Sequence, residues 1–541
     1  MKDISSTGSF VDFTLENFIY VDKTVYIPQL VKLKRVFISR PRRFGKSLTL
    51  DTIATLFETG VEPYFKGTWI YDKWTEPTYP VLRLNFLNFD KNTLEKFNNK
   101  LNSKITEFAE LNQVTTYKEK EEAEDSIDHL LEQLRLEGRQ IVILIDEYDC
   151  QMTANINNET LYKQFQEKIK SFYANIKDKF AIKFLGITGV TRLKDVSIFS
   201  VGSDINDITN ASAYSQMIGF TRDEIKKYYI DYLKLASSYE NNCSVDDVTD
   251  TQLESMLDMM AQNYDGYCFD EDYEKKVFST WSVNKFFQTM IEKKKVQFGE
   301  YWYDNGGLPS ILVNYLKTHA LNIFEYLDKD KFLKVSSDDF KNPTALTTIN
   351  QNVLMCQTGY LTLRSDLNKT STVALGIPNG EIYKALNRLL ANNIFKGNTD
   401  ITDDYGRSLL EVGTVDDIIN LFNSALNSVS YDNYPIVSES SVQNMLKLYL
   451  LGAHQEVLSE VHEAKVRADL IVNTDIRRIV FEFKYAQNES EAKTKLSETV
   501  EQIKSRDYGN ILPKKHELLR IAAVFNADPK VRAFTENQIV P

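Results

Sequence analysis

The sequence predicts an α/β protein with a three-layer N-terminal domain, a mostly helical central region and a second α/β region at the C-terminal end. Strand-like and helix-like segments alternate from about residue 35 to 190, helical patterns dominate 216–430, and strand patterns return after about residue 431. Strands that alternate with helices indicate parallel strands joined by crossover helices. We therefore expect domains at residues 1–215, 216–430 and 431–541.

Bulk composition is that of a folded globular protein. The chain has 541 residues, too many for one core, and 43% of them are hydrophobic and 26% charged. No apolar run is long enough to cross a bilayer, and the first ten residues lack the apolar stretch of a signal peptide. We expect a cytoplasmic protein without membrane contact. The four cysteines are too dispersed for a zinc pair and too few for a disulfide framework, so we expect reduced thiols.

The charge distribution limits how the protein meets nucleic acid. A formal net charge of -12 argues against nonspecific coating of nucleic acid. A local basic groove remains compatible with this charge, because residues 31–47 carry seven cations and no acid. Cations also outnumber acids in residues 504–532, where a solvated face is an equally good interpretation.

The N-terminal elements follow from hydrophobic patterning. The continuous apolar run at 141–145 is typical of a strand buried on both faces. Farther along, Thr221 with Glu224 and Thr251 with Glu254 predict the starts of two helices. The expected order is a strand at 36–38, a helix at 46–57, a strand at 81–86, helices at 93–112 and 122–137, the strand at 141–145, a helix at 158–178 and a strand at 181–187.

A phosphate-binding loop is indicated between the first strand and the first helix, where residues 40–47 read RPRRFGKS. Backbone N–H groups at a helix start bind phosphate, Lys46 is placed to reach the outer phosphates, and the Ser47 hydroxyl is placed to hold Mg²⁺. Arg40 stands where the usual pattern has its first glycine, and a basic loop without nucleotide is the alternative. The expected nucleotide-binding residues are Arg43, Phe44, Gly45, Lys46, Ser47, Leu48 and Asp146.

Adjacent carboxylates at the end of the strand at 141–145 support the same interpretation. Asp146 is suited to hold Mg²⁺ together with Ser47, and Glu147 to polarise the attacking water as a catalytic residue. Either feature alone has an ordinary structural explanation, but the two in this order predict ATP binding and hydrolysis. Hydrolysis also needs a sensor or a positioned cation, for which Thr188, Thr191 and Arg192 are the candidates.

Near the C-terminus, Asp469 starts one predicted strand, and Glu482 and Lys484 lie on the next. Side chains alternate across a strand, so Glu482 and Lys484 share one face while Phe481 and Phe483 point to the core. A hairpin that brings Asp469 beside Glu482 presents two carboxylates and an ammonium, a set that suits Mg²⁺ and the activation of water. By spacing alone, the better explanation is an ordinary hairpin edge with a Glu–Lys salt bridge, which is very common in proteins.

Further polar residues flank this hairpin. Glu460 lies on a preceding segment with a helical pattern, Arg467 stands just before the first strand, and Gln502 falls on the next helix with Tyr508 beyond it. We expect these groups to face one cleft.

Short motifs along nearly the whole chain carry a resemblance to a known family. They are YVDKT at 20–24, SRPRRFGKSL at 39–48, GFT at 219–221, YDGY at 264–267, YW at 301–302, GYL at 359–361, RAD at 467–469 and EFK at 482–484. The chain resembles bacterial proteins that pair an AAA-ATPase-like N-terminal domain with a PD-(D/E)xK nuclease superfamily domain. In this family Arg40 in place of glycine is the usual pattern.

The resemblance implies a P-loop NTPase domain and a restriction-endonuclease-like C-terminal α/β domain. Asp469, Glu482 and Lys484 fall on the nuclease signature positions and Glu460 on a fourth acidic position, with Ala468 where the signature has proline. The implied metal ligands are therefore Glu460, Asp469 and Glu482, and the implied cofactors are ATP and Mg²⁺, with Mn²⁺ an alternative at the nuclease site.

We thus expect an ATP-binding, ATP-hydrolysing enzyme with a Mg²⁺-dependent nuclease domain that cuts nucleic acid, DNA in the first place. Two alternatives stay open. One is a nucleotide-dependent switch or interaction protein with an inactive nuclease fold, and the other is an ATPase motor whose C-terminal domain only binds nucleic acid. The sequence also leaves open whether the protein forms a homo-oligomer.

Overall fold

The computed structural model describes residues 1–176, 179–193, 205–304, 310–316, 319, 322–343, 345–346, 348–395, 405–453, 455–463, 466–506 and 517–541. The chain divides into two compact units. The N-terminal unit comprises Met1–His319 and Phe332–Ile382, and the C-terminal unit comprises Ala320–Lys331 and Tyr383–Pro541. The three-domain division at residues 215 and 430 stays a prediction.

A parallel five-stranded sheet forms the centre of the N-terminal unit, as the sequence predicts. Its strand order is β2-β3-β4-β1-β5, and every pairing is parallel. The strand β3 is buried along its whole length, which explains its uninterrupted apolar sequence. The strands are β1 (Arg35–Ser39), β2 (Val81–Asn85), β3 (Ile141–Asp146), β4 (Ile182–Gly189) and β5 (Asn206–Asp207).

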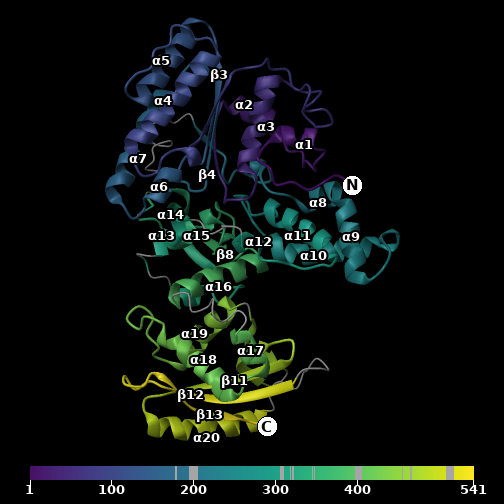
Figure 1. Cartoon of the computed structure of the whole chain (residues 1–541), viewed down its shortest axis with the longest axis vertical. Coiled ribbons are helices and arrows are strands. Elements are labelled where there is room, and N and C mark those ends of the chain that lie inside the picture. Colours follow the sequence, from purple (N-terminus) through teal and green to yellow (C-terminus); the bar gives the residue numbers. More distant parts are fainter. Residues whose placement is uncertain are drawn as a thin grey trace. The chain divides into compact units, whose positions relative to one another are not determined.

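Helices cover both faces of this sheet and complete three layers. Figure 1 shows α4, α5 and α7 on one side of the sheet, with α2 and α3 on the other. The helices at 46–57, 93–112, 122–137 and 158–178 are confirmed to within a few residues. The helices of this part are α1 (Phe10–Leu15), α2 (Ile27–Leu33), α3 (Lys46–Thr59), α4 (Leu94–Leu111), α5 (Ala123–Leu136), α6 (Cys150–Ala154) and α7 (Glu159–Ile176).

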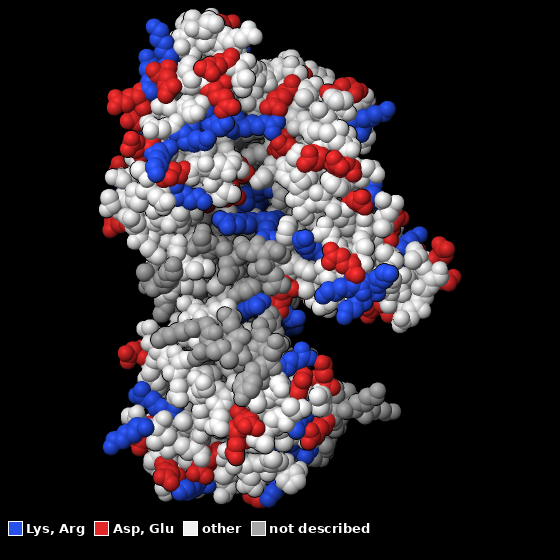
Figure 2. All heavy atoms as spheres, in the orientation of Figure 1, with Lys and Arg blue, Asp and Glu red and all other residues white. Residues whose placement is uncertain are grey.

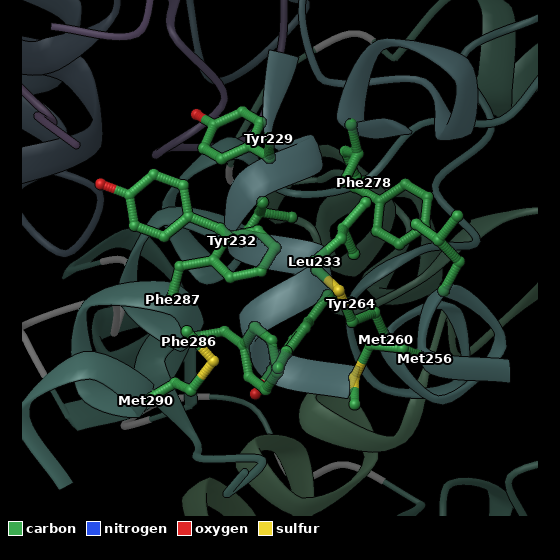
Figure 3. Close-up of a cluster of buried hydrophobic side chains, with 14 of the residues drawn as sticks. Tyr229, Tyr232, Leu233, Met256, Met260, Tyr264, Phe278, Phe286, Phe287 and Met290 are labelled. Carbon is green, nitrogen blue, oxygen red and sulfur yellow. The ribbon is translucent and has the colours of Figure 1, made fainter. Parts of the chain in front are cut away.

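A helical bundle follows the sheet domain within the same unit. Aromatic and methionine side chains from α9, α10 and α11 contribute to its core, including Tyr232, Tyr264 and Phe287 (Figure 3). The helices of the central region are α8 (Arg222–Tyr228), α9 (Ile230–Asn241), α10 (Asp250–Tyr264), α11 (Thr280–Lys293), α12 (Tyr301–Asp304), α13 (Ser310–Leu316), α14 (Ser337–Lys341), α15 (Gln351–Thr358) and α16 (Gly380–Ile394).

The central region is mostly helical, as the sequence predicts, and also contains a small antiparallel sheet, in the order β6-β8-β7, built from β6 (Leu333–Ser336), β7 (Thr362–Leu363) and β8 (Thr372–Gly376). One sequence expectation for this region needs correction. The second capping box is made by Thr249 and Gln252, because α10 begins at Asp250, whereas the box at Thr221 and Glu224 is confirmed.

The C-terminal unit is a second three-layer arrangement. Its sheet has the order β13-β12-β11-β10-β9, in which only β11 and β12 pair in parallel. Figure 1 shows α18 and α19 on one face of the sheet and α20 on the other. The elements are α17 (Tyr405–Val412), α18 (Val415–Asn427), α19 (Glu439–Gly452), β9 (Glu456–Glu463), β10 (Val466–Asn473), β11 (Arg477–Ala486), α20 (Glu489–Arg506), β12 (Glu517–Asn526) and β13 (Ala533–Ile539).

The helix expected around Glu460 is wrong, since β9 occupies this segment. The strand β9 pairs antiparallel with β10 from Glu456 to Glu463, so its backbone hydrogen bonds go to the sheet. Pairing with a neighbouring strand outweighs a local helical preference, which is a weak determinant on its own.

The surface and the thiols agree with the composition. Figure 2 shows acidic and basic side chains interspersed over the face in view. In the described part of the chain, no helix combines the length and the apolar character that a membrane span requires. The four cysteines are free, with Cys150 and Cys268 buried.

Candidate nucleotide and nuclease sites

The loop between β1 and α3 has the geometry of a phosphate-binding loop. Gly45 precedes α3 with φ 101°, a left-handed conformation that glycine adopts without steric cost. Lys46 is the first residue of α3, and its ammonium donates to the carbonyls of Arg40 and Pro41 at 3.1 and 3.3 Å. Glu147 Oε1 lies 3.4 Å from the same ammonium. The loop therefore holds its lysine inside the turn, as phosphate binding requires.

Hydrogen bonds join Ser47 at the start of α3, Asp146 at the end of β3 and Thr188 near the end of β4. The Ser47 hydroxyl donates to Asp146 Oδ2 at 2.6 Å, and the Thr188 hydroxyl donates to Asp146 Oδ1 at 2.5 Å. The three residues meet because β4 lies next to both β1 and β3, so the carboxyl ends of all three strands share one edge. A hydroxyl and a carboxylate held together in this way are suitable oxygen ligands for Mg²⁺.

The three sensor candidates separate clearly in the structure. Thr188 contacts Asp146, whereas the Thr191 hydroxyl and backbone N–H both donate to buried Asp149. Arg192 forms an ion pair with Asp207. Thr188 is therefore the one of the three whose side chain joins the Ser47–Asp146 group.

Arg40 stands where the usual phosphate-binding loop pattern has its first glycine, and its contacts show how the loop accommodates a large side chain there. Its guanidinium is fully buried and donates to the carbonyls of Ser39 and Thr209 at 2.9 and 2.6 Å. It also lies 4.2 Å from the centre of the Phe269 ring. Burial lowers the pKa of Arg40 to about 9. The side chain thus anchors the loop to the strand β5 region and to the central part of the unit.

A cavity of about 330 Å³ opens onto the phosphate-binding loop. Its lining includes Lys46, Ser47 and Glu147 on one side and Tyr20 and Gly219 on another. The remaining lining comes from the N-terminal segment, α3 and the helical bundle, so the cavity lies where sheet domain and bundle meet within one unit. Where the loop lines the cavity, Arg42, Arg43 and Lys46 outnumber the single acid Glu147, which favours a polyanionic ligand.

The motifs of the central region, to which spacing alone assigned no chemistry, pack around this loop. Phe44 is buried against the rings of Tyr267 and Trp302, with centroids 4.7 and 6.0 Å away. Gly359 has φ 92°, and a Cβ there would lie 2.9 Å from Pro41 Cβ, so a glycine is required. The family motifs at 264–267, 301–302 and 359–361 therefore support the phosphate-binding loop.

The C-terminal hairpin forms as the sequence predicts. The strands β10 and β11 pair antiparallel with Leu470 opposite Phe481, which brings Asp469 beside Glu482. Asp469 Oδ2 accepts a hydrogen bond from Phe483 N at 2.8 Å. Phe481 and Phe483 are buried on the opposite face and stack with centroids 5.5 Å apart.

Lys484 and Gln502 both lie beside Glu482. The Lys484 ammonium lies 3.7 Å from Glu482 Oε1, and the Gln502 amide donates to the same oxygen. Glu482 is only 2% exposed. The side chains of Glu460 and Arg467, and the whole of Tyr508, lie outside the described residues.

Glu439 is a site residue that the sequence interpretation missed. It is the first residue of α19, and its Oε1 lies 3.1 Å from the Lys484 ammonium. The available signal was an acidic residue after Ser438 at the start of an amphipathic helix ahead of the hairpin. Acidic residues are common at helix starts, because a negative charge there interacts favourably with the helix dipole. The signal therefore does not single out Glu439.

Burial and charge shift the pKa values of this group. Burial raises the pKa of Asp469, against the hydrogen bond from Phe483 N and the charge of Lys484. Burial alone would lower the pKa of Lys484, but the carboxylates of Glu439, Glu482 and Asp469 outweigh it and raise that pKa. The site thus favours a charged ammonium among carboxylates.

The donor set of this site suits a hard divalent cation, because it consists of carboxylate oxygens, those of Glu482 buried and those of Asp469 and Glu439 partly exposed. Across the residues that the structure describes, no three His, Cys, Asp or Glu side chains are arranged to hold a metal ion. The Lys484 ammonium is the cation that these carboxylates contact in this conformation.

Comparison with known proteins gives the class of each domain. Residues 5–199 match the family described as predicted AAA-ATPase, and residues 437–534 match the PD-(D/E)XK nuclease superfamily. The chain thus joins an AAA-ATPase-like domain to a PD-(D/E)XK nuclease-like domain.

Two individual proteins are similar over much of the chain. One is described as an uncharacterized protein in the vnfD 5' region of Azotobacter chroococcum mcd 1; it is 26% identical over 533 residues, covering 95% of this chain and 94% of its own. The crystal structure of Cdc6p from Pyrobaculum aerophilum covers 70% of this chain and 95% of its own, at 11% identity and a TM-score of 0.23. A TM-score this low supports no structural argument.

Proposed function

We propose that the N-terminal unit binds and hydrolyses ATP with Mg²⁺, and that the C-terminal unit is a metal-dependent nuclease acting on nucleic acid, DNA in the first place. The observation that carries the first part is the chain Ser47–Asp146–Thr188 beside Lys46. Of these residues, Lys46 and Ser47 line a cavity of about 330 Å³. Magnesium held by Ser47 and Asp146 would neutralise phosphate charge, and Glu147 would orient and polarise the attacking water.

The second part rests on the group of Asp469, Glu482, Lys484 and Glu439, in which Glu482 is buried and the other three are partly exposed. The carboxylates would hold Mg²⁺ or Mn²⁺, which supplies charge stabilisation and an activated water. Lys484, at hydrogen-bonding distance from Glu439, is suited to orient the nucleophile or to neutralise charge on the scissile phosphate. Gln502 would orient Glu482 through its amide. Glu460, the fourth acidic residue implied by resemblance, remains part of the proposal as a further ligand.

A second candidate function is a nucleotide-dependent switch whose nuclease fold does not cut. The observation in its favour is that Lys484 forms ion pairs with Glu439 and Glu482, so the carboxylates of the described site already have a cationic partner. An ATPase motor whose C-terminal domain only binds nucleic acid also predicts that no DNA is cut, and it further predicts translocation along DNA.

One experiment tests both parts. The purified chain is incubated with plasmid and with linear DNA, with Mg²⁺ or Mn²⁺, with and without ATP, and both DNA cleavage and phosphate release are measured. The Lys46→Ala variant should lose ATP binding and hydrolysis, and Asp469→Ala should lose cleavage only. Lys32→Ala and Asp475→Ala, both at exposed positions, serve as matched controls.

Absence of ATP binding by the wild-type chain, or unchanged affinity in Lys46→Ala, would exclude the nucleotide site. Hydrolysis without any cleavage of either DNA would select the switch or, if translocation is measured, the motor.

A further inference from the structure

One residue of the phosphate-binding loop is joined to the helical bundle by three separate contacts. The Arg43 carbonyl accepts hydrogen bonds from the Thr280 hydroxyl at 2.9 Å and from Trp281 N at 3.4 Å. The Arg43 guanidinium lies 4.3 Å from the centre of the Trp281 ring. Thr280 and Trp281 are the first two residues of α11, so the loop is attached directly to the start of this helix.

The backbone of Arg43 adopts a conformation that points to a specific role. Its φ is 70°, in the left-handed region that residues with a Cβ rarely occupy. The two hydrogen bonds to its carbonyl hold the peptide in this conformation. Backbone strain that the surrounding structure maintains is concentrated at functional sites, which makes Arg43 a candidate for function beyond packing.

Arg43 and the two lysines that line the cavity, Lys23 and Lys46, contact different parts of the unit. Lys23 is engaged with Glu224 Oε2 at 2.6 Å and with the Gln216 carbonyl at 2.7 Å. Lys46 lies inside the turn of the loop. Arg43 reaches the cavity from the bundle side, together with Thr280 and Trp281, which line it as well.

A guanidinium stacked on an aromatic ring keeps its N–H groups in the plane of the fork. It can therefore bind a phosphate edge-on while its face remains on the ring. The Trp281 ring is itself anchored, because its Nε1 donates to the Tyr301 carbonyl at 3.2 Å. Burial and the neighbouring charge of Arg42 lower the pKa of Arg43. An incoming phosphate would offset the repulsion between these two cations.

We propose that Trp281 and Thr280 are positioning residues that hold Arg43 against the terminal phosphate of a bound nucleoside triphosphate. Arg43 supplies, from within the same chain, the positive charge that hydrolysis requires. Because only a triphosphate reaches Arg43, the Arg43–Trp281 contact makes the position of α11 depend on whether a triphosphate or a diphosphate is bound. The Ser282 hydroxyl, on the same turn of α11, donates to Glu381 Oε2 at 2.7 Å, so a movement of this turn reaches the first turn of α16. This inference rests on the proposed nucleotide binding.

The test compares MgATP and MgADP by calorimetry in the full chain and four variants, with steady-state hydrolysis measured in parallel. In Trp281→Leu, ATP affinity should fall about tenfold while ADP affinity changes by less than about twofold, since only the triphosphate reaches Arg43. Trp281→Phe keeps an aromatic face and should recover part of the loss. Arg43→Ala should lose the distinction between the two nucleotides and also lower kcat.

Lys285→Ala is the matched control, because Lys285 lies 5.1 Å from the same ring but does not line the cavity. It should leave both affinities unchanged. Equal losses for ATP and ADP in Trp281→Leu and Trp281→Phe, with unaltered thermal unfolding, would reduce the contact to packing and overturn the inference. If the wild-type chain binds neither nucleotide, the proposed function itself fails and not merely the role of Trp281.

Discussion

The two candidate sites of this protein have opposite charge arrangements. Around the phosphate-binding loop, cations such as Arg43 and Lys46 line a cavity with Glu147 as the facing acid. At the C-terminal hairpin, Glu439, Glu482 and Asp469 surround the single ammonium of Lys484. The first arrangement favours a polyanion and the second a cation. Each site is therefore built for a different charge, and the two should respond differently to loss of one residue.

The largest expected effect is at the C-terminal site. Asp469→Ala or Glu482→Ala should remove metal binding and reduce DNA cleavage by about a thousandfold or more, because the metal supplies both charge stabilisation and the activated water. ATP affinity should stay unchanged. Cleavage with Mg²⁺ or Mn²⁺ and calorimetry with MgATP measure the two quantities, and a variant that still cuts would place the metal elsewhere.

Glu147→Gln should lower ATP hydrolysis by about a hundredfold, because the water loses its polarising carboxylate while the side chain keeps its shape. ATP affinity should hold or rise slightly, since the 3.4 Å contact between Lys46 and Glu147 loses its charge and frees the lysine for phosphate. Phosphate release and calorimetry measure these effects. Equal turnover in wild type and variant would remove Glu147 from the mechanism.

A smaller effect is expected at Glu439. Glu439→Gln keeps a hydrogen-bond acceptor for Lys484 at 3.1 Å but removes one charge, so cleavage should fall by about tenfold and the metal concentration for half-maximal activity should rise. Lys484→Ala, by contrast, should retain metal binding and lose only the cleavage rate. If Glu439→Gln leaves both quantities at the wild-type level, the residue serves the helix start alone.

The smallest expected effect is on the free energy of unfolding, and it comes from Glu381, a carboxyl group of the N-terminal unit that burial keeps protonated. Glu381 is fully buried, and its oxygens accept from Ser282 Oγ and Trp302 N at 2.7 and 2.8 Å. Burial raises its pKa to about 8 from an ordinary 4.5. An acid with a raised pKa contributes stability that is fully present below the ordinary value and is lost as the pH rises toward the folded value.

Between about pH 5 and 8, the free energy of unfolding of the wild type should therefore fall relative to that of Glu381→Gln, by at most about 1.4 kcal/mol per pH unit. Below about pH 4.5 the two should be parallel. Chemical denaturation at a series of pH values measures this difference, with Glu325→Gln as a control for general charge removal. A pH-independent difference would mean that Glu381 is ionised in the folded chain.

Local sequence was sufficient to predict the elements that carry the candidate site residues. The strand before Asp146, the loop around Lys46 and the alternation of Glu482 with Phe483 each depend on residues within one segment. Their predicted positions are confirmed because a buried strand, a glycine-containing turn and a two-residue period all leave a local pattern. The strands β9, β12 and β13 were not predicted, although β9 pairs with the next strand in sequence and β13 with the preceding one, because their residue patterns are ambiguous.

The sequence by itself determined two chemically distinct groups of candidate residues, since Lys46 with Asp146 and Asp469 with Glu482 are each recognisable by residue type and spacing. Only the tertiary structure decided which residues surround them. Glu439 contacts Lys484, Gly359 packs on Pro41, and Trp281 stacks on Arg43. In each pair the two residues are far apart in sequence, and only the fold brings them together. Long-range contacts depend on how whole elements pack, and local propensity and periodicity carry no information about them.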